Sequence, residues 1–377
     1  MIGQLFKIKM FNYYQTNQTE QQNQKQFQAK ELESYFPPHQ LKNGLLMTLH
    51  IAFRASKTWE KNVLETEPFY QEKIFLGAQE VPIYGLVAIP NQAKGTIIGT
   101  YGITGDLNNQ WFLRILGRKA YARGYAVVLF DWRGHGKTAQ LSSTLTSDGL
   151  YEGEDFVKIA GCEAEPFGVA AKEMGCPAPF WFTGYSLGGQ LALWGIKSAL
   201  NHPDIAGGAV ICPSLDSNRS LTYLEQHPFG KYVEKKIAQS LKQLALKLHS
   251  YHPHEFDLAA INRANSIRGF DRELVINRLG FSSPEEYYEA CNALYLLPQL
   301  TKPTLILYAE DDPLFDPQII PDLKQACEEN SAIDLILTKY GGHVGYISNK
   351  TCQKNYGDRD CWWAWNRVLD WCDQNFN

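Results

Sequence analysis

The strongest chemical signal in this 377-residue chain is a serine held between glycines, Gly184-Tyr185-Ser186-Leu187-Gly188. By itself this pattern is equally typical of a glycine-rich turn with an incidental serine. Its surroundings favour a catalytic role for the serine, because residues 181–183 are typical of a buried strand and residues 191–194 of a helix. A serine at such a strand-to-helix corner is raised above the sheet, at a helix N-terminus that favours negative charge. We therefore interpret Ser186 as a nucleophile.

A serine nucleophile needs a base, and an acid that orients the base. His343 lies in a glycine-rich loop, Gly341-Gly342-His343-Val344-Gly345, directly after the last expected strand. Asp312 follows the preceding expected strand in Glu310-Asp311-Asp312-Pro313, and Pro313 restrains its backbone to an extended conformation. We assign His343 as the base and Asp312 as the acid, with Asp311 as the alternative acid.

Attack on a carbonyl also requires two N–H groups that stabilise the oxyanion. The first candidate is the backbone of Leu187, the residue after the nucleophile. The second is the backbone of Ile103, which follows the third expected strand. In this scheme His343 takes the proton of Ser186 as the hydroxyl attacks, and later returns it to the leaving group.

The other noticeable histidines have simpler interpretations. We expect His135 to position loops, with Asp131 and Arg133 forming a local ion pair beside it. The trio His249, His252 and His254 has no acidic or cysteine ligand at regular spacing, so it predicts surface histidines and no metal site. No cofactor is expected.

Strands and helices alternate along the chain and must position these residues. The pattern predicts a mostly parallel eight-stranded sheet with helices on both faces, and an active site beyond the carboxyl ends of the strands. The expected strands are 73–79, 81–89, 95–100, 125–130, 180–183, 205–212, 304–308 and 332–337, and the expected core helices are 109–122, 151–174 and 358–372.

A long insertion separates the strand ending at Cys212 from the strand starting at Thr304. Residues 232–249 and 284–297 have the apolar spacing of amphipathic helices. A crossover needs only one helix, so we predict an inserted helical cap over about residues 215–300. Such a cap would lie over the strand ends and exclude water from the site.

Composition narrows the class of protein. The chain is 44% hydrophobic and 20% charged with a net charge of -4, which is typical of a globular enzyme and gives no basic field for nucleic acid. No apolar run approaches the roughly 18 residues that span a bilayer, and no export signal is evident, so we expect a cytoplasmic protein. The Gln- and Asn-rich stretch 15–28 predicts that residues 1–34 form a partly disordered tail before one domain, 35–377.

The eight cysteines show no paired CxxC spacing, so free thiols are expected. One disulfide among Cys352, Cys361 and Cys372 is left open.

Three stretches resemble the α/β-hydrolase superfamily, and within it the YheT/EMB8-like branch. The first is Phe36-Pro37-Pro38 followed by Leu41-Lys42-Asn43-Gly44-Leu45-Leu46-Met47-Thr48. The second is Phe270-Asp271 with Gly280-Phe281-Ser282-Ser283 and Tyr287-Tyr288, and the third comprises the acid and base loops described above. The resemblance covers the chain from about Tyr35 onward and implies an α/β-hydrolase fold with a triad of Ser186, Asp312 and His343 in that order.

The chain departs from this branch where Tyr101-Gly102 replaces the usual His-Gly, which leaves open how the oxyanion loop is anchored. The resemblance implies hydrolysis of esters, including lipid esters. We therefore expect a serine hydrolase acting on a small-molecule ester. A thioesterase, an aminopeptidase-like hydrolase, an acyltransferase and a non-catalytic binding module stay open as alternatives, as do transient contact with a membrane surface and the oligomeric state.

Overall fold

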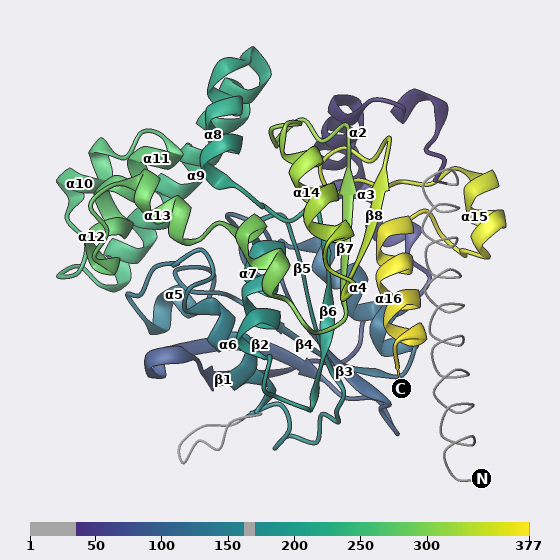
Figure 1. Cartoon of the computed structure of the whole chain (residues 1–377). Coiled ribbons are helices and arrows are strands. Elements are labelled where there is room, and N and C mark those ends of the chain that lie inside the picture. Colours follow the sequence, from purple (N-terminus) through teal and green to yellow (C-terminus); the bar gives the residue numbers. More distant parts are fainter. Residues whose placement is uncertain (1–34, 162–169, 377) are drawn as a thin grey trace, which may run out of the picture.

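The computed structural model describes residues 35–161 and 170–376. The predicted tail, residues 1–34, and Cys162 lie outside the described residues. An eight-stranded sheet forms the centre, with the strand order β1-β2-β4-β3-β5-β6-β7-β8 (Figure 1). The strands are β1 (Gln71–Leu76), β2 (Pro82–Ala88), β3 (Gly95–Thr100), β4 (Tyr125–Phe130), β5 (Phe180–Tyr185), β6 (Ile205–Ile211), β7 (Thr304–Ala309) and β8 (Ile333–Thr338).

The sheet is parallel from β4 to β8, and β2 pairs antiparallel with both β1 and β4. Every residue of β3, β4, β5 and β7 is buried, which explains why their sequences are continuous apolar or β-branched runs. The edge strand β1 instead exposes its first residues. The predicted eight-stranded, mostly parallel sheet with helices on both faces is therefore confirmed.

Helices cover both faces of this sheet. On one face α4 packs against β3 and β4, and α16 packs against β6 and β7. On the other face α7 packs against β5 and β6, beside α6, and α14 packs against β8. The core helices are α4 (Trp111–Ala122), α5 (Thr138–Leu141), α6 (Glu152–Ala160), α7 (Leu187–Ser198), α14 (Ile319–Glu328), α15 (Lys350–Tyr356) and α16 (Trp363–Gln374).

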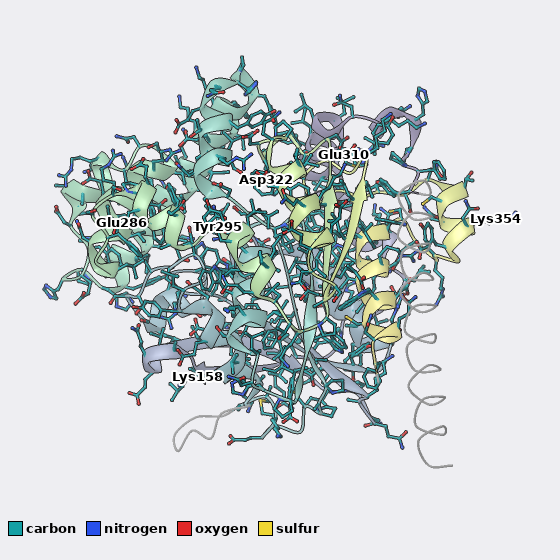
Figure 2. All side chains as sticks on the ribbon, viewed as in Figure 1. Lys158, Glu286, Tyr295, Glu310, Asp322 and Lys354 are labelled. Atoms are coloured by element: carbon teal, nitrogen blue, oxygen red, sulfur yellow. The ribbon has the colours of Figure 1, made fainter. Side chains whose placement is uncertain are left out.

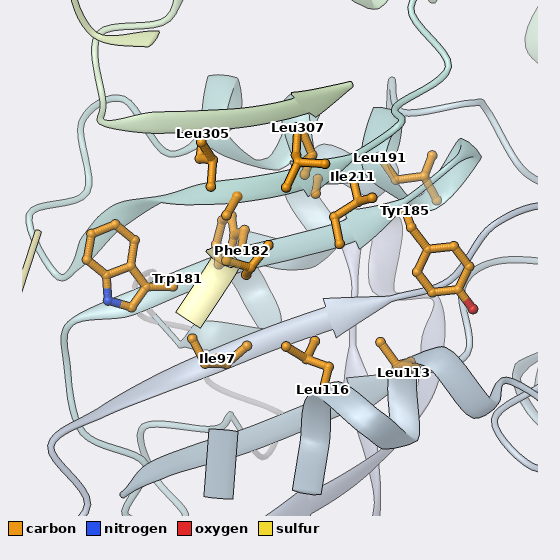
Figure 3. Close-up of a cluster of buried hydrophobic side chains, with 14 of the residues drawn as sticks. Ile97, Leu113, Leu116, Trp181, Phe182, Tyr185, Leu191, Ile211, Leu305 and Leu307 are labelled. Atoms are coloured by element: carbon orange, nitrogen blue, oxygen red, sulfur yellow. The ribbon is translucent and has the colours of Figure 1, made fainter. Parts of the chain in front are cut away.

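The strand that carries the candidate nucleophile lies in the middle of the hydrophobic core. In Figure 3, side chains of β5 are surrounded by side chains of the neighbouring strands and of α4. Because β5 is buried on both faces, its carboxyl end holds Ser186 in a fixed position. The core residues labelled there are Ile97, Leu113, Leu116, Trp181, Phe182, Tyr185, Leu191, Ile211, Leu305 and Leu307.

Three predicted helices have different bounds in the structure. The helix predicted for 151–174 ends at Ala160, where Gly161 adopts a left-handed conformation with φ +80°. The helix predicted for 358–372 begins only at Trp363, and Gly357, with φ +71°, ends the preceding α15. The helix predicted for 284–297 is divided by Asn292, whose backbone is extended.

An N-terminal arm precedes β1, and short turns of helix make up most of it. Asn43 caps α2 by accepting a hydrogen bond from the amide of Leu46. The elements before β2 are η1 (His39–Leu41), α2 (Gly44–His50), the π-helical η2 (Ile51–Ala55), α3 (Ser56–Thr58), η3 (Trp59–Asn62) and η4 (Ala78–Glu80).

The chain between β6 and β7 forms a separate group of helices at one end of the sheet (Figure 1). The helices up to residue 290 have their own cluster of buried apolar side chains, which includes Leu241, Leu248, Phe256 and Tyr287, whereas the buried side chains of residues 293–299 belong to the core around the sheet. The group comprises α8 (Ser217–Gln226), α9 (Pro228–Tyr251), α10 (Leu258–Arg263), α11 (Ile267–Phe270), η5 (Asp271–Val275), α12 (Ile276–Leu279), α13 (Pro284–Ala290) and η6 (Ala293–Gln299), and we call it the cap.

Charged side chains lie mainly on the outside, as Figure 2 shows for Glu286 on the cap and Glu310 beyond β7.

The predicted ion pair between Asp131 and Arg133 is wrong. Arg133 instead pairs with the buried Asp155, at 2.8 Å from Nε to Oδ2. The carboxylate of Asp131 is occupied by other donors, the hydroxyl of Tyr101 and the amides of Leu107 and Lys137.

Within the described ranges, no helix has both the length and the apolar character required to cross a membrane.

Candidate active site

Ser186 occupies a sharp corner between β5 and α7. Its backbone has φ 55° and ψ -129°, a conformation that residues other than glycine rarely adopt. The flanking glycines allow the close approach that this corner requires. A Cβ on Gly184 would lie 2.1 Å from the carbonyl oxygen of Gly188, and a Cβ on Gly188 would lie 2.3 Å from that of Tyr101. The strand-to-helix context predicted for this serine is therefore present.

The three side chains assigned from the sequence meet at the carboxyl ends of the strands. Nε2 of His343 lies 3.0 Å from Oγ of Ser186, and Nδ1 of His343 lies 2.8 Å from Oδ2 of Asp312. Asp312 is buried, and its second oxygen accepts a hydrogen bond from the amide of Leu314 at 2.9 Å. The ring of Phe315 packs edge-on against the imidazole. This arrangement gives the hydroxyl a base and gives the base an orienting carboxylate.

The neighbouring carboxylate, Asp311, points elsewhere. Its Oδ1 accepts a hydrogen bond from the amide of Gly342 at 2.8 Å, one residue before the histidine. Burial raises the pKa of Asp311 to about 6. Asp311 therefore supports the backbone of the histidine loop, whereas Asp312 contacts the ring.

The N-terminal arm also holds the histidine loop, which sequence reasoning did not assign to it. Oγ1 of Thr48 accepts a hydrogen bond from the amide of His343 at 2.9 Å. Gly342, with φ +57°, approaches the arm so closely that a Cβ on it would lie 2.6 Å from the carbonyl oxygen of Gly44. The Asn-Gly…Thr pattern of the arm is the sequence signal for this contact, and it is among the residues that carry the family resemblance.

Of the two candidate oxyanion donors, Leu187 follows Ser186 directly and Ile103 lines the same cavity as Ser186. Neither the amide of Leu187 nor that of Ile103 donates to a backbone or side-chain oxygen among the described residues. Gly102 packs directly on the serine, since a Cβ built on it would lie 2.9 Å from the Cβ of Ser186. The role of the two amides stays a prediction.

Tyr101 anchors the loop that carries Ile103. Its buried hydroxyl donates to Oδ1 of Asp131 at 2.6 Å, and the same carboxylate oxygen accepts from the amide of Leu107 at 2.9 Å. The tyrosine therefore ties the loop after β3 to the end of β4. The oxyanion loop is therefore anchored by the Tyr101 hydroxyl in this chain, where the related proteins usually have a histidine.

His135 lines the cavity beside the site but is not part of the hydrogen-bonded group. Its ring stacks on Trp132 with centroids 3.6 Å apart, and its Nδ1 lies 3.1 Å from the carbonyl oxygen of Arg133. Burial lowers the pKa of His135 to about 4, so the ring is neutral at pH 7. Two of the predicted surface histidines, His249 and His252, face the carbonyl oxygens of Phe256 and Ala139.

A cavity of about 440 Å³ lies above Ser186 and His343. Its walls are mostly apolar and come from both the cap and the core. Apolar walls exclude water and suit an acyl chain. The cap contributes Leu221, Leu224, Val233, Ile237, Leu241, Leu244, Ile267 and Phe270.

One part of the cavity wall is acidic. Asp148 lies in the core loop between α5 and α6, Asp271 begins η5 in the cap, and both are buried. The hydroxyl of Tyr288 donates to Oδ2 of Asp271. Nearby, the amide of the Gln190 side chain joins core and cap by donating to the carbonyl oxygens of Asp148 and Cys291. Burial raises the pKa of both carboxyl groups, and the charge of Asp271 raises that of Asp148 further.

This acidic pair predicts a pH-dependent stability. Unfolded aspartates ionise near pH 4, so between about pH 4 and the raised native pKa values the folded protein holds more protons than the unfolded chain. The contribution of the pair to the free energy of unfolding therefore falls as pH rises through this window. Asp271→Asn should stabilise the protein relative to wild type, by an amount that grows from pH 4 to pH 8 and reaches about 1–3 kcal/mol.

Urea unfolding at several pH values measures this difference. Glu328→Gln is the matched control, because Glu328 is an exposed residue at the end of α14 that makes no ion pair among the described residues, so its removal should change the free energy of unfolding little at any of these pH values. A gain for Asp271→Asn that does not change with pH would contradict the prediction.

The seven described cysteines form no disulfide, so none joins Cys352, Cys361 and Cys372.

Comparison with known proteins places the chain in a family. The family model described as "alpha/beta hydrolase fold" matches residues 95–350. The chain is 52% identical over 356 residues to "Putative esterase slr0264" of Synechocystis sp., covering 90% of this chain and 94% of that protein. It is 27% identical over 283 residues to "Putative esterase YheT" of Escherichia coli, covering 74% and 77%.

Among solved structures, the esterase Pf2001 of Pyrococcus furiosus superposes with a TM-score of 0.52, covering 82% of this chain and 91% of that chain. At 14% identity this likeness concerns the fold alone. From the family match and the relatives together, the chain belongs to the α/β-hydrolase fold family and, within it, to the YheT/EMB8-like branch.

Proposed function

We propose that this protein is a serine hydrolase that cleaves carboxylic esters, with the acyl group held in the apolar cavity beneath the cap. The hydrogen-bonded series Asp312–His343–Ser186 at the base of that cavity carries the proposal. The names of its relatives, two of which include the word esterase, point to the same reaction class.

In the first step His343 accepts the proton of Ser186 through Nε2 while Oγ attacks the ester carbonyl carbon. Asp312 holds Nδ1–H and stabilises the imidazolium that forms. The amides of Leu187 and Ile103 would receive the oxyanion, and each such donor contributes about 3 kcal/mol to catalysis. The imidazolium then protonates the departing alcohol, which leaves an acyl group on Ser186. Water activated by His343 releases the acid and restores the hydroxyl.

The cavity should set the length of the acyl chain. Ile237 of α9 lines it, so Ile237→Trp is expected to fill space that a long acyl chain occupies. The value of kcat/KM for a long-chain p-nitrophenyl ester should fall at least about tenfold, whereas that for the acetyl ester should change little. Kinetics across a series of p-nitrophenyl esters from acetyl to palmitoyl measure this.

Lys236→Trp provides the matched control, because Lys236 is the adjacent residue on α9 and is exposed. An equal loss for short and long esters in Ile237→Trp would show that the cavity does not bind the acyl chain. If wild type hydrolyses no ester of the series but cleaves acyl-CoA or aminoacyl amides, the proposed reaction is wrong.

A further inference from the structure

The N-terminal arm is apolar on two sides. One side of α2 and η2 is buried against the core through Met47, Ile51 and Ala55. The other side carries Leu46 and Phe53, which are 51% and 61% exposed. Both side chains are exposed on a helical segment whose buried side chains face the core, so they lie on its outer side. Large apolar side chains gathered on one exposed face are typical of a surface that binds something else.

This exposed face adjoins the entrance of the cavity. Thr48, Ile51 and Ala52 of the same helical segment line the cavity, and Ala52 is also exposed. The cavity therefore reaches the surface beside Phe53. In Figure 1, α2 lies at the end of the sheet to which the arrowheads of β7 and β8 point, the same end as the candidate site.

The arm is also basic, in a chain whose net charge is -4. Lys42, Arg54, Lys57 and Lys61 are exposed, and none of them has a carboxylate within ion-pair distance among the described residues. The single acidic residue between positions 35 and 63, Glu60, faces Arg118 of α4 at 3.5 Å. The charge on this face therefore suits an anionic partner.

We propose that Leu46 and Phe53, together with Arg54 and Lys57, dock onto the surface of an anionic lipid bilayer and place the cavity entrance at that surface. Apolar side chains would enter the headgroup region while the cations contact lipid phosphates. Residues 1–34 of the same chain are a poorer match for this face, because they contain four lysines and three glutamates and are themselves cationic. The proposal rests on the proposed function only in naming lipid esters as the substrate delivered there.

Flotation of the full-length protein with vesicles tests the docking surface. Wild type should float with vesicles that contain phosphatidylglycerol and much less with pure phosphatidylcholine. The double variants Leu46→Ser/Phe53→Ser and Arg54→Gln/Lys57→Gln should each lower binding by about tenfold or more. Phe69→Ser is the matched control, because Phe69 is 87% exposed but lies after the arm and outside the cavity lining.

Turnover of a water-soluble short ester is measured on the same samples. None of the substituted residues lines the cavity, so all variants should retain wild-type turnover. The docking surface is excluded if wild type floats with neither vesicle, if Phe69→Ser loses as much binding as the arm variants, or if binding appears only after residues 1–34 are deleted. Absent ester turnover in wild type would refute the proposed function and leave the flotation result standing.

Discussion

Ser186→Ala is expected to lower kcat for a short p-nitrophenyl ester by about 10⁴- to 10⁶-fold without unfolding the protein. The hydroxyl of Ser186 is the group at Nε2 of His343, at the base of the apolar cavity. Without it no acyl-enzyme forms, and only the surrounding donors continue to stabilise a transition state. The backbone corner should survive, since alanine pays no larger steric penalty at φ 55° than serine.

Ser214→Ala is the matched control for this measurement. Ser214 also lines the cavity, and its side chain contacts Ser217 at 3.3 Å. Its amide bonds the carbonyl oxygen of Ser186, a contact that alanine retains. This variant should keep kcat within about tenfold of wild type. A fluorophosphonate probe should label wild type at Ser186 and leave Ser186→Ala unlabelled; retained turnover or labelling elsewhere in that variant would mean that the nucleophile is another residue.

The second prediction with a large effect on kcat distinguishes the roles of two adjacent carboxylates. Asp312→Asn should reduce kcat by about 10³- to 10⁴-fold, because an amide at Oδ2 favours the wrong imidazole tautomer and cannot stabilise the imidazolium. Asp311→Asn should reduce it by less than about tenfold, because an asparagine oxygen can still accept the hydrogen bond from the amide of Gly342. Steady-state kinetics on both purified variants measure the contrast.

Circular dichroism and thermal unfolding of both variants show whether each keeps the fold, so that a kinetic loss is not mistaken for unfolding. If Asp311→Asn is the more damaging of two folded variants, the acid has been assigned to the wrong residue. Equal and small losses would mean that neither carboxylate orients His343.

Local sequence determined much of the fold. The strands β3, β4 and β7 were found almost to the residue, because a strand buried on both faces must be apolar throughout. The corner at Ser186 was equally readable, since only glycine tolerates the contacts at positions 184 and 188. Helix ends were less readable where one turn residue decides them. Gly161 ends a helix that apolar spacing alone continues to Met174, and α16 begins at Trp363 although the predicted helix starts at Asp358.

Which residues support the site depends on contacts between distant parts of the chain. Thr48 lies 295 positions from His343, and Arg133 pairs with Asp155 rather than with Asp131 two residues away. Periodicity and turn chemistry describe neighbours along the chain, whereas these contacts depend on how the arm, the loops and the strand ends pack against one another. Residue types along the chain are therefore enough to predict the strands, the serine corner and the order of the candidate residues. Packing decided which carboxylate meets the imidazole, what holds its loop, and where the cavity opens.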